Sequence, residues 1–439
     1  MSRIDTDTWT RSALARAEVL AGAGEGVLAT LRAAGREAFG AMNLPGPKSE
    51  SWKYSRVGPL LEEGLLDRPV ADGTTLSPAP LSGVETARLT LVDGVLDPAA
   101  SADLLPEGVT VRRFSELTGD LAARVATECG RLAPATARPF VALNAALAED
   151  GIVLHVARDR KVALPIELIL AQRANAAPCG AHPRVLVLAD AGAQLTLVER
   201  QVGDALQFTN TVMEVVVQTG ARVDHVRLAL QTGAARWLTA LDVEVHDDGR
   251  YALHQALLGA AFRRSEIRLW AAGPGAHIEV GGATLTRDRT HLDTQLCIEH
   301  AVPHCSSNQV FRSIAGERSR TILNGRIHIH PDAQKTAAEF NTRNLLLSAS
   351  AEINAKPELE IYADDVTCAH GATVGQLDEA ALFYLRARGI DAQQARTLLA
   401  FAFLASVVAA FPVAGLADAV RGELDEAFSA GALELEAGA

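Results

Sequence analysis

A cysteine and a histidine stand one residue apart in the segment DDVTCAHGATVGQ, residues 364–376. If this segment is extended, Cys368 and His370 point to the same side, together with Val366. A thiolate beside an imidazole suits soft or borderline metal ions, and a protonated imidazole would favour the thiolate. Two ligands cannot complete a tetrahedral site, so a metal here needs ligands from a second chain or is held loosely. A buried structural cysteine with a hydrogen-bonded histidine is the alternative that the spacing leaves open.

A second group of histidines and cysteines lies between residues 291 and 330. In the stretch RIHIHP, an extended chain puts His328 and His330 on one face and Ile327 and Ile329 on the other. This pattern fits either a metal site on the face of a sheet or a solvated strand face. The spacing matches no closed zinc pattern, so it favours the solvated face. The group consists of His291, Cys297, His300, His304, Cys305, His328 and His330.

The composition is that of a folded chain with an aliphatic core. Of the 439 residues, 48% are hydrophobic and 5% are aromatic, which supplies a large core and excludes global disorder. Either two or three ordinary domains or one elongated repeat would account for this length. The net charge is −12, whereas a protein that binds nucleic acid needs a surface with an excess of basic residues. We therefore expect no nucleic-acid partner.

The sequence carries no pattern of secretion or of a membrane span. The N-terminal stretch MSRIDTDTWTRSALARAEVL contains acidic side chains and no compact apolar run, unlike a signal peptide. The longest apolar run, residues 398–411, is shorter than the roughly 20 residues that a spanning helix needs. Five cysteines, an odd number, indicate free thiols rather than a disulfide framework. We therefore expect a cytoplasmic protein with no membrane partner.

The elements that must position the candidate ligands change in character along the chain. Residues 8–42 and 114–149 have helical patterning. The stretch ARLTLVDGVLDP, residues 87–98, predicts a hairpin with Asp93 and Gly94 as its turn. From about residue 151 the pattern becomes strand-like, and helical patterning returns only after Gln376.

A weak repeat runs through the strand-like region. Short alternations of apolar and polar residues each follow a glycine, and the successive glycines are 28, 29 and 26 residues apart. Near-constant spacing of short strands predicts a β-solenoid in which each repeat forms about one coil. A β-sandwich with evenly spaced hairpins is the alternative that the pattern leaves open. The glycines are Gly192, Gly220, Gly249 and Gly275.

The C-terminal part predicts a small helical domain. Asp378 and Asp391 are placed as the N-caps of two helices. A third helix carries one apolar stripe, made of Leu416, Val420, Leu424 and Phe428.

Motifs for nucleotide binding and for acyl transfer are absent from the sequence. There is no G-x-x-x-x-G-K-[ST] loop, no G-x-G-x-x-G between a strand and a helix, and no G-x-S-x-G elbow. Any energy from ATP would therefore have to come through a partner.

The segment with Cys368 and His370, residues 364–376, lies inside a longer stretch, PELEIYADDVTCAHGATVGQLDEAALFYLRARGI (357–390). This stretch resembles the signature of the SufB/SufD family of iron–sulfur cluster assembly proteins. The stretches NLLLSASAEINAKPELEI, FVALNAALAEDG and ESWKYSRV are similar to other parts of the same family. The pattern Cys-x-His-Gly-Ala-Thr is most similar to the SufD branch, because SufB-like chains typically carry an acidic residue at the position of Gly371.

The resemblance implies a mainly β fold with flanking helices: a right-handed parallel β-helix core between N-terminal and C-terminal helical domains. With the patterning above, the expected parts are a mostly helical domain over 1–150, the β-helix over 151–376 and the helical domain over 377–439. The family role is that of a non-enzymatic scaffold for iron–sulfur cluster assembly.

The resemblance also implies partners and a site. A SufB-like chain would pair with this chain through the two β-helices, and the C-terminal helices would dock a SufC-like ABC ATPase. A transient iron–sulfur cluster would form at the interface, with His370 as a metal ligand beside partner-chain ligands and Cys368 at the same interface. No cofactor is expected to stay bound to this chain alone. Exposed strand edges predict a homodimer in isolation. The competing hypothesis is a metal-dependent β-solenoid enzyme that uses region 291–330.

Overall fold

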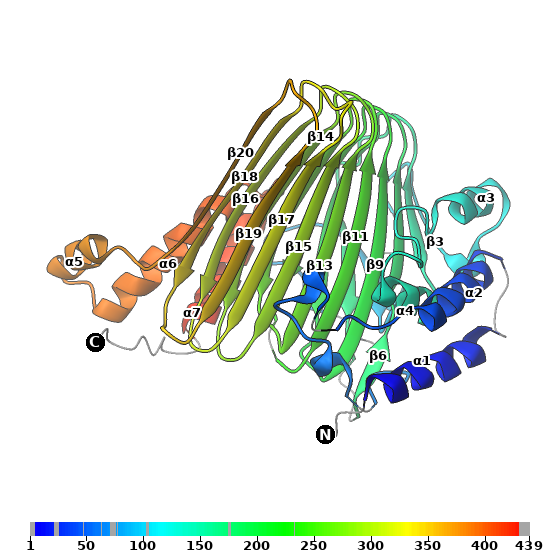
Figure 1. Ribbon diagram of the computed structural model, residues 1–439, viewed down its shortest axis with the longest axis horizontal. Helices are drawn as coiled ribbons and strands as arrows, with labels where there is room; N and C mark the ends of the chain where they lie inside the picture. Colours follow the sequence, from blue (N-terminus) through cyan, green and yellow to red (C-terminus); the bar gives the residue numbers. More distant parts are fainter. Residues whose placement is uncertain are drawn as a thin grey trace.

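The computed structural model describes residues 5–21, 26–46, 48–62, 64–70, 76, 78–101, 105–173, 177–231 and 233–429. Two ten-stranded sheets dominate this described part of the chain and wind together as a β-solenoid (Figure 1). The last ten residues of the predicted C-terminal domain lie outside the described residues.

The first sheet contains, in order across it, β2 (Val95–Leu96), β1 (Ala87–Val92), β5 (Ile166–Ala171), β8 (Gln194–Val202), β10 (Arg222–Ala229), β12 (Arg250–Leu258), β14 (His277–Thr286), β16 (Ser306–Ala315), β18 (Ala337–Leu346) and β20 (Thr367–Gly375). The second sheet contains β19 (Glu352–Ile361), β17 (Arg320–Ile329), β15 (His291–His300), β13 (Phe262–Ala271), β11 (Arg236–Val245), β9 (Gln207–Val217), β7 (Arg184–Ala189), β4 (Ile152–Val156) and β3 (Val109–Arg113), with β6 (Cys179–Ala181) beside β9.

Each coil of the solenoid contributes one strand to each sheet, so neighbouring strands from successive coils are parallel and one repeat apart. The pairs β1–β2 and β3–β4 at the start of the sheets are antiparallel. Gln194 pairs with Arg222, Arg222 with Arg250, and Arg250 with His277. These strands begin one or two residues after the glycines of the predicted repeat, so the solenoid prediction is confirmed. The sandwich alternative is wrong, because its sheets would be antiparallel.

Two of the repeat glycines show why glycine recurs at this corner of the coil. Gly192 and Gly220 have φ angles of +71° and +65°. Residues with a side chain adopt this left-handed conformation at a cost, whereas glycine adopts it freely.

The sheets begin earlier in the chain than the boundary expected at residue 151. β1 and β2 form the predicted hairpin, and Asp93 and Gly94 both have positive φ at its turn. β1 also pairs in parallel with β5, and β3 pairs with β4. The N-terminal part therefore supplies the first strands of both sheets as well as helices.

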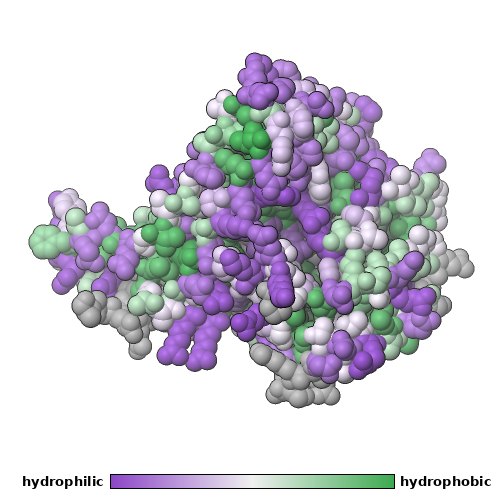
Figure 2. Space-filling view, viewed as in Figure 1, coloured by the Kyte–Doolittle hydropathy of each residue, from purple (hydrophilic) through white to green (hydrophobic). Residues whose placement is uncertain are grey.

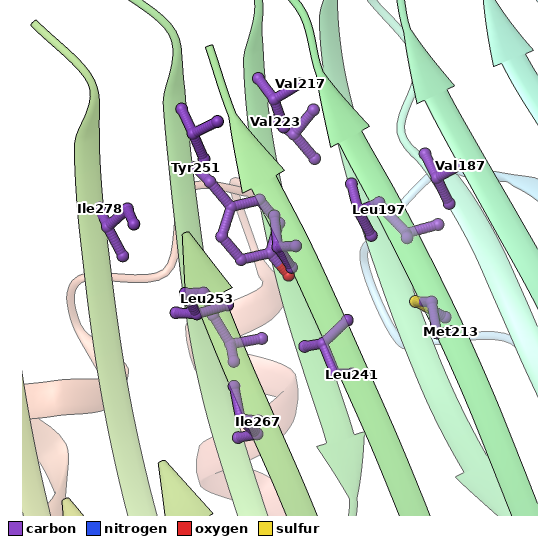
Figure 3. Packing of buried hydrophobic residues seen from close by; sticks show 14 of the residues in the cluster. Val187, Leu197, Met213, Val217, Val223, Leu241, Tyr251, Leu253, Ile267 and Ile278 are labelled. Atoms are coloured by element: carbon purple, nitrogen blue, oxygen red, sulfur yellow. The ribbon is translucent and has the colours of Figure 1, made fainter. Parts of the chain in front are cut away.

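The interior of the solenoid is filled by the inward-facing side chains of both sheets. Leu197, Val223 and Leu253 from the first sheet meet Met213 and Leu241 from the second sheet (Figure 3). Inward and outward positions alternate along each strand, which places one aliphatic set inside and a more polar set outside.

The helices α1 (Thr6–Ala21), α2 (Gly26–Ala41), α3 (Gly119–Glu128) and α4 (Pro139–Leu147) lie at one end of the solenoid (Figure 1). The 3-10 segment that follows α2 reaches further along the outer face of the second sheet. There the Trp52 ring stacks on Phe262, with ring centroids 6.4 Å apart, and the Arg264 guanidinium lies 4.1 Å from the Trp52 ring centroid.

The helices α5 (Glu379–Ala387), α6 (Ala392–Val408) and α7 (Leu416–Ser429) follow the last strand. Asp378 and Asp391 accept hydrogen bonds from the first backbone amides of α5 and α6, as their predicted N-cap roles require. The predicted stripe of α7 is buried, and with α6 it covers outward-facing apolar residues of the first sheet, such as Leu228 and Leu285. Among the described helices, none is long and apolar enough to cross a membrane.

Two phenylalanines occupy the interior near the last coils, and glycines opposite them make the room. Phe311 and Phe340 stack with ring centroids 5.9 Å apart. A Cβ on Gly325 would lie 2.1 Å from the Phe340 ring, and a Cβ on Gly282 would lie 2.5 Å from the Phe311 ring.

We predict that Gly325→Ala destabilises the solenoid by roughly 1–3 kcal/mol, because the added methyl group overlaps a fully packed ring. The measurement is the midpoint of thermal or denaturant unfolding. Gly375→Ala is the control, because a Cβ there meets no atom within 4 Å. Equal midpoints for the two variants would show that the interior near Phe340 relaxes freely.

Candidate functional site

The solenoid ends in two strands that each have a neighbour on one side only. β20 is the last strand of the first sheet and β19 the last strand of the second, and they pair with β18 and β17 (Figure 1). Their outer edges carry backbone N–H and C=O groups that no described strand pairs. We call the surface formed by β19 and β20 the open end.

Cys368 and His370 lie on β20 at positions that face the solenoid interior. Their register partners on β18, Ala338 and Phe340, are buried in the interior core. Cys368 packs against that core together with Val366, as the predicted shared orientation requires. His370 occupies the equivalent position further along β20 but is exposed, because no further coil covers it.

Two apolar side chains of the same last strands are exposed at the open end. Ile361 on β19 pairs with the fully buried Ile329, yet it is 40% exposed itself. Val374 on β20 pairs with the buried Asn344 and is 48% exposed. The last coil therefore presents core-type positions to its surroundings instead of to another coil.

A second cluster of metal-type side chains lies on the outer face of the second sheet. Glu299 on β15 and His328 on β17 are register partners, and His330 follows two residues later. The Glu299 Oε2 atom lies 2.7 Å from His328 Nδ1 and 2.9 Å from His330 Nε2. The two imidazoles stack with ring centroids 4.3 Å apart. We call these three residues the His–Glu–His cluster.

The orientation of this cluster agrees with the predicted alternation along RIHIHP. Ile327 and Ile329 are buried in the interior, while His328 and His330 lie on the outer face. Sequence reasoning missed Glu299. Its one signal is that it stands a repeat length before His328, which becomes visible only when the register of the coils is known.

The other oxygen of Glu299 is held from the opposite side. Glu299 Oε1 accepts hydrogen bonds from Arg326 Nη2 at 3.1 Å and from Cys297 Sγ at 3.3 Å. Arg326 also lies 3.2 Å from the carboxylate of Glu360. Burial alone would raise the pKa of Glu299, but hydrogen bonds from His330 and Cys297 and the nearby cationic groups lower it overall.

A groove opens beside the cluster, between the second sheet and the segment around residues 43–52. Its volume is about 610 Å³, and Cys297, Glu299 and Arg326 contribute to its wall. Small solutes can therefore approach one side of Glu299 from solvent.

The remaining members of the 291–330 group serve the fold and do not join the cluster. His291 Nε2 lies 2.7 Å from Ser55 Oγ, and burial lowers the pKa of His291 to about 4. His300 Nε2 lies 2.8 Å from Ser307 Oγ, and burial lowers its pKa to about 4 as well. Cys305 is buried, and His304 sits in a turn with φ of +62°.

The five cysteines are all free thiols, and burial raises the pKa of each one. It raises the pKa to about 11 for Cys129, about 12 for Cys179 and about 11 for Cys297. The pKa values of Cys305 and Cys368 are also raised. The isolated chain thus keeps its cysteines protonated at neutral pH.

Comparisons with known proteins cover most of the chain. The model of the SufBD protein N-terminal region matches residues 14–168, and the model of the SufBD core domain of SUF system FeS cluster assembly matches residues 171–403. The chain is 30% identical over 402 residues to the iron–sulfur cluster assembly protein SufD of Escherichia coli, which spans 89% of this chain and 90% of that protein.

Two further relatives extend the range of organisms. An iron–sulfur cluster assembly SufBD family protein of Synechocystis is 28% identical over 425 residues, which is 93% of each chain. The chloroplastic protein ABCI7 of Arabidopsis thaliana is 31% identical over 328 residues, which is 72% of this chain and 68% of that protein.

The raised thiol pKa values predict slow alkylation of the isolated chain at neutral pH. Only the thiolate reacts, so the rate at Cys368 should rise about tenfold per pH unit between pH 7 and 9. The measurement is iodoacetamide labelling of Cys368 followed by mass spectrometry at several pH values. A fast labelling phase that is constant from pH 6 to 8 would reveal an activated thiolate and contradict the prediction.

Proposed function

The chain belongs to the SufB/SufD family of iron–sulfur cluster assembly proteins, and on this basis we propose that it acts as a SufD-like scaffold rather than as a catalyst. Two observations together carry the proposal: the family match, and the open end, where Cys368 and His370 occupy inward-type positions that no further coil covers. A scaffold of this kind holds part of a site and leaves the rest to its partners.

We propose that a SufB-like chain covers the open end. Unpaired strand edges recruit other strands, and the exposed Ile361 and Val374 favour burial against apolar side chains of a partner. In the absence of that partner, the same surface pairs two copies of this chain as a homodimer.

At this interface, His370 would contribute one ligand to a transient iron–sulfur cluster that is the cargo of the complex. A neutral imidazole can ligate iron, whereas Cys368 is partly buried and its thiol is kept protonated by burial. The partner chain therefore supplies the principal thiolate, and Cys368 has a supporting role.

The C-terminal helices are the proposed docking surface for a SufC-like ABC ATPase. The inner faces of α6 and α7 are buried on the first sheet. On α5, Phe383 and Tyr384 are 72% and 55% exposed. Leu398 on α6 is exposed as well, and hydrophobic side chains gather over these helices at the left of Figure 2. Exposed aromatic residues are common anchors of protein interfaces.

The competing hypothesis is a metal enzyme that uses region 291–330, but most of the residues it would need as metal ligands have other roles in the fold. His291 and His300 are buried and hydrogen-bonded to serines, which leaves only His328 and His330 with Glu299.

We predict that His370→Ala keeps the fold, partner binding, self-association and ATPase activity of the complex, but lowers cluster content severalfold. The side chain is exposed, so its removal costs little stability, while one ligand of the shared site is lost. The measurement is iron and acid-labile sulfide in the complex purified without oxygen. Thr373→Ala, an exposed change on the same strand, is the control, and Cys368→Ala should be milder than His370→Ala.

Wild-type cluster content in His370→Ala would reduce this chain to a structural adaptor between the ATPase and its partner.

We predict that the double variant Phe383→Ala and Tyr384→Ala weakens co-purification of the ATPase without lowering the unfolding midpoint. Both side chains are exposed, so the change removes contact area for a partner but no core packing. Deleting residues 377–439 is a blunter test, because it also uncovers the apolar outer face of the first sheet. Val19→Ala, an exposed apolar change on α1, is the control, and undiminished co-purification by the double variant would place the docking surface elsewhere.

A further inference from the structure

We propose that Glu299, His328 and His330 bind one divalent transition-metal ion on the outer face of the second sheet. This site is separate from the open end, and it stands whether or not His370 takes part in cluster assembly.

Glu299 and His328 project from adjacent, hydrogen-bonded strands, and His330 is the first residue after the second of these strands. Glu299 and His328 are register partners on β15 and β17, and the backbone of His330 donates to the carbonyl of His300 at 3.0 Å. Sites built on sheet strands hold their ligating side chains in a more precise geometry than sites built on loops do. The outward alternation of β17 places both imidazoles on the face that Glu299 shares.

The donor atoms already stand close to the separations that a metal ion requires. Bonds of about 2.0–2.2 Å to nitrogen and oxygen place neighbouring donors roughly 3.0–3.5 Å apart in octahedral or tetrahedral geometry. Glu299 Oε2 lies 2.7 Å from His328 Nδ1 and 2.9 Å from His330 Nε2. Binding therefore replaces the protons of these two hydrogen bonds by one ion, and all three donor atoms already lie within 4.8 Å of one another.

Outer contacts fix the carboxylate in the orientation that the ion needs. Arg326 and Cys297 hold Glu299 Oε1 and leave Oε2 directed at the imidazoles. Glu360 pairs with Arg326 in turn. The two carboxylates and one guanidinium leave this group with a net negative charge, which favours a cation. Contacts of this kind, made to the ligating side chains and not to the metal, orient the ligands and raise the affinity for the metal.

The donor set indicates the class of ion. Two imidazoles and one carboxylate suit Zn²⁺, Fe²⁺, Co²⁺ and Ni²⁺, whereas Ca²⁺ and Mg²⁺ prefer oxygen ligands alone. Three protein ligands leave further positions to water or to a solute. The side chains of His328 and His330 are 21% and 40% exposed, so water and ions reach them.

The test is titration of the chelator-treated, full-length protein with Co²⁺, followed by absorption spectroscopy and by competition with Zn²⁺. We expect one high-affinity Co²⁺ per chain, displaced by Zn²⁺ but not by excess Mg²⁺ or Ca²⁺. His330→Ala and Glu299→Gln should each weaken Co²⁺ binding by at least about tenfold. His330→Ala is the cleaner variant, because its side chain is partly exposed and its removal leaves the core intact.

His304→Ala is the matched control, because it removes an exposed histidine outside the cluster, and it should bind Co²⁺ as the wild type does. Zn²⁺ should also raise the unfolding midpoint of the wild type, but not that of Glu299→Gln.

Three results would overturn the proposal: no stoichiometric Co²⁺ binding, binding that His330→Ala leaves unchanged, or loss of that binding in His304→Ala. An intense thiolate-to-cobalt charge-transfer band would also overturn the ligand set, because it would make Cys297 a ligand.

Discussion

The in-register stacking of parallel coils is the constraint on which the rest of this structure depends. Each strand hydrogen-bonds to strands one repeat earlier and one repeat later, so residues far apart in the sequence stand side by side. The same pairing fixes which side chains turn inward, because a slip of one residue would exchange the two faces. Core packing, the groove and both candidate sites follow from this one register.

A stack of coils must end, and the two ends of this solenoid are treated differently. At the first end, the N-terminal helices and the hairpin of β1 and β2 lie against the sheets. At the last end, β19 and β20 keep inward-type side chains with no coil above them. A long unpaired strand edge is a liability for a protein that works alone. It is an advantage for a scaffold whose site is shared with a partner, because each chain then needs to carry only part of the ligand set.

The regular parts of the fold could be predicted from sequence, since they rest on local patterns. The glycine spacing predicted the solenoid, alternation predicted the shared orientation of His328 and His330, and two aspartates predicted helix starts. Glu299 could not be found in this way, because its partners lie a full coil later and only the register brings them together. The burial of side chains could not be predicted from sequence either. His291 is a candidate ligand in the sequence, but in the fold it is largely buried and hydrogen-bonded to Ser55 of the N-terminal segment.

The alternation of strand faces also separates the two candidate sites by chemistry. Cys368 and His370 take inward-type positions, so they become accessible only where the stack ends, and a partner can enclose them completely. Glu299, His328 and His330 take outward positions within the stack, so they keep one side toward solvent whatever covers the open end. An enclosed site suits assembly of a labile cluster away from water, whereas an outer site suits reversible exchange of a single ion. One repeating backbone thus supports both environments, because a residue's parity along the strand decides which of them it joins.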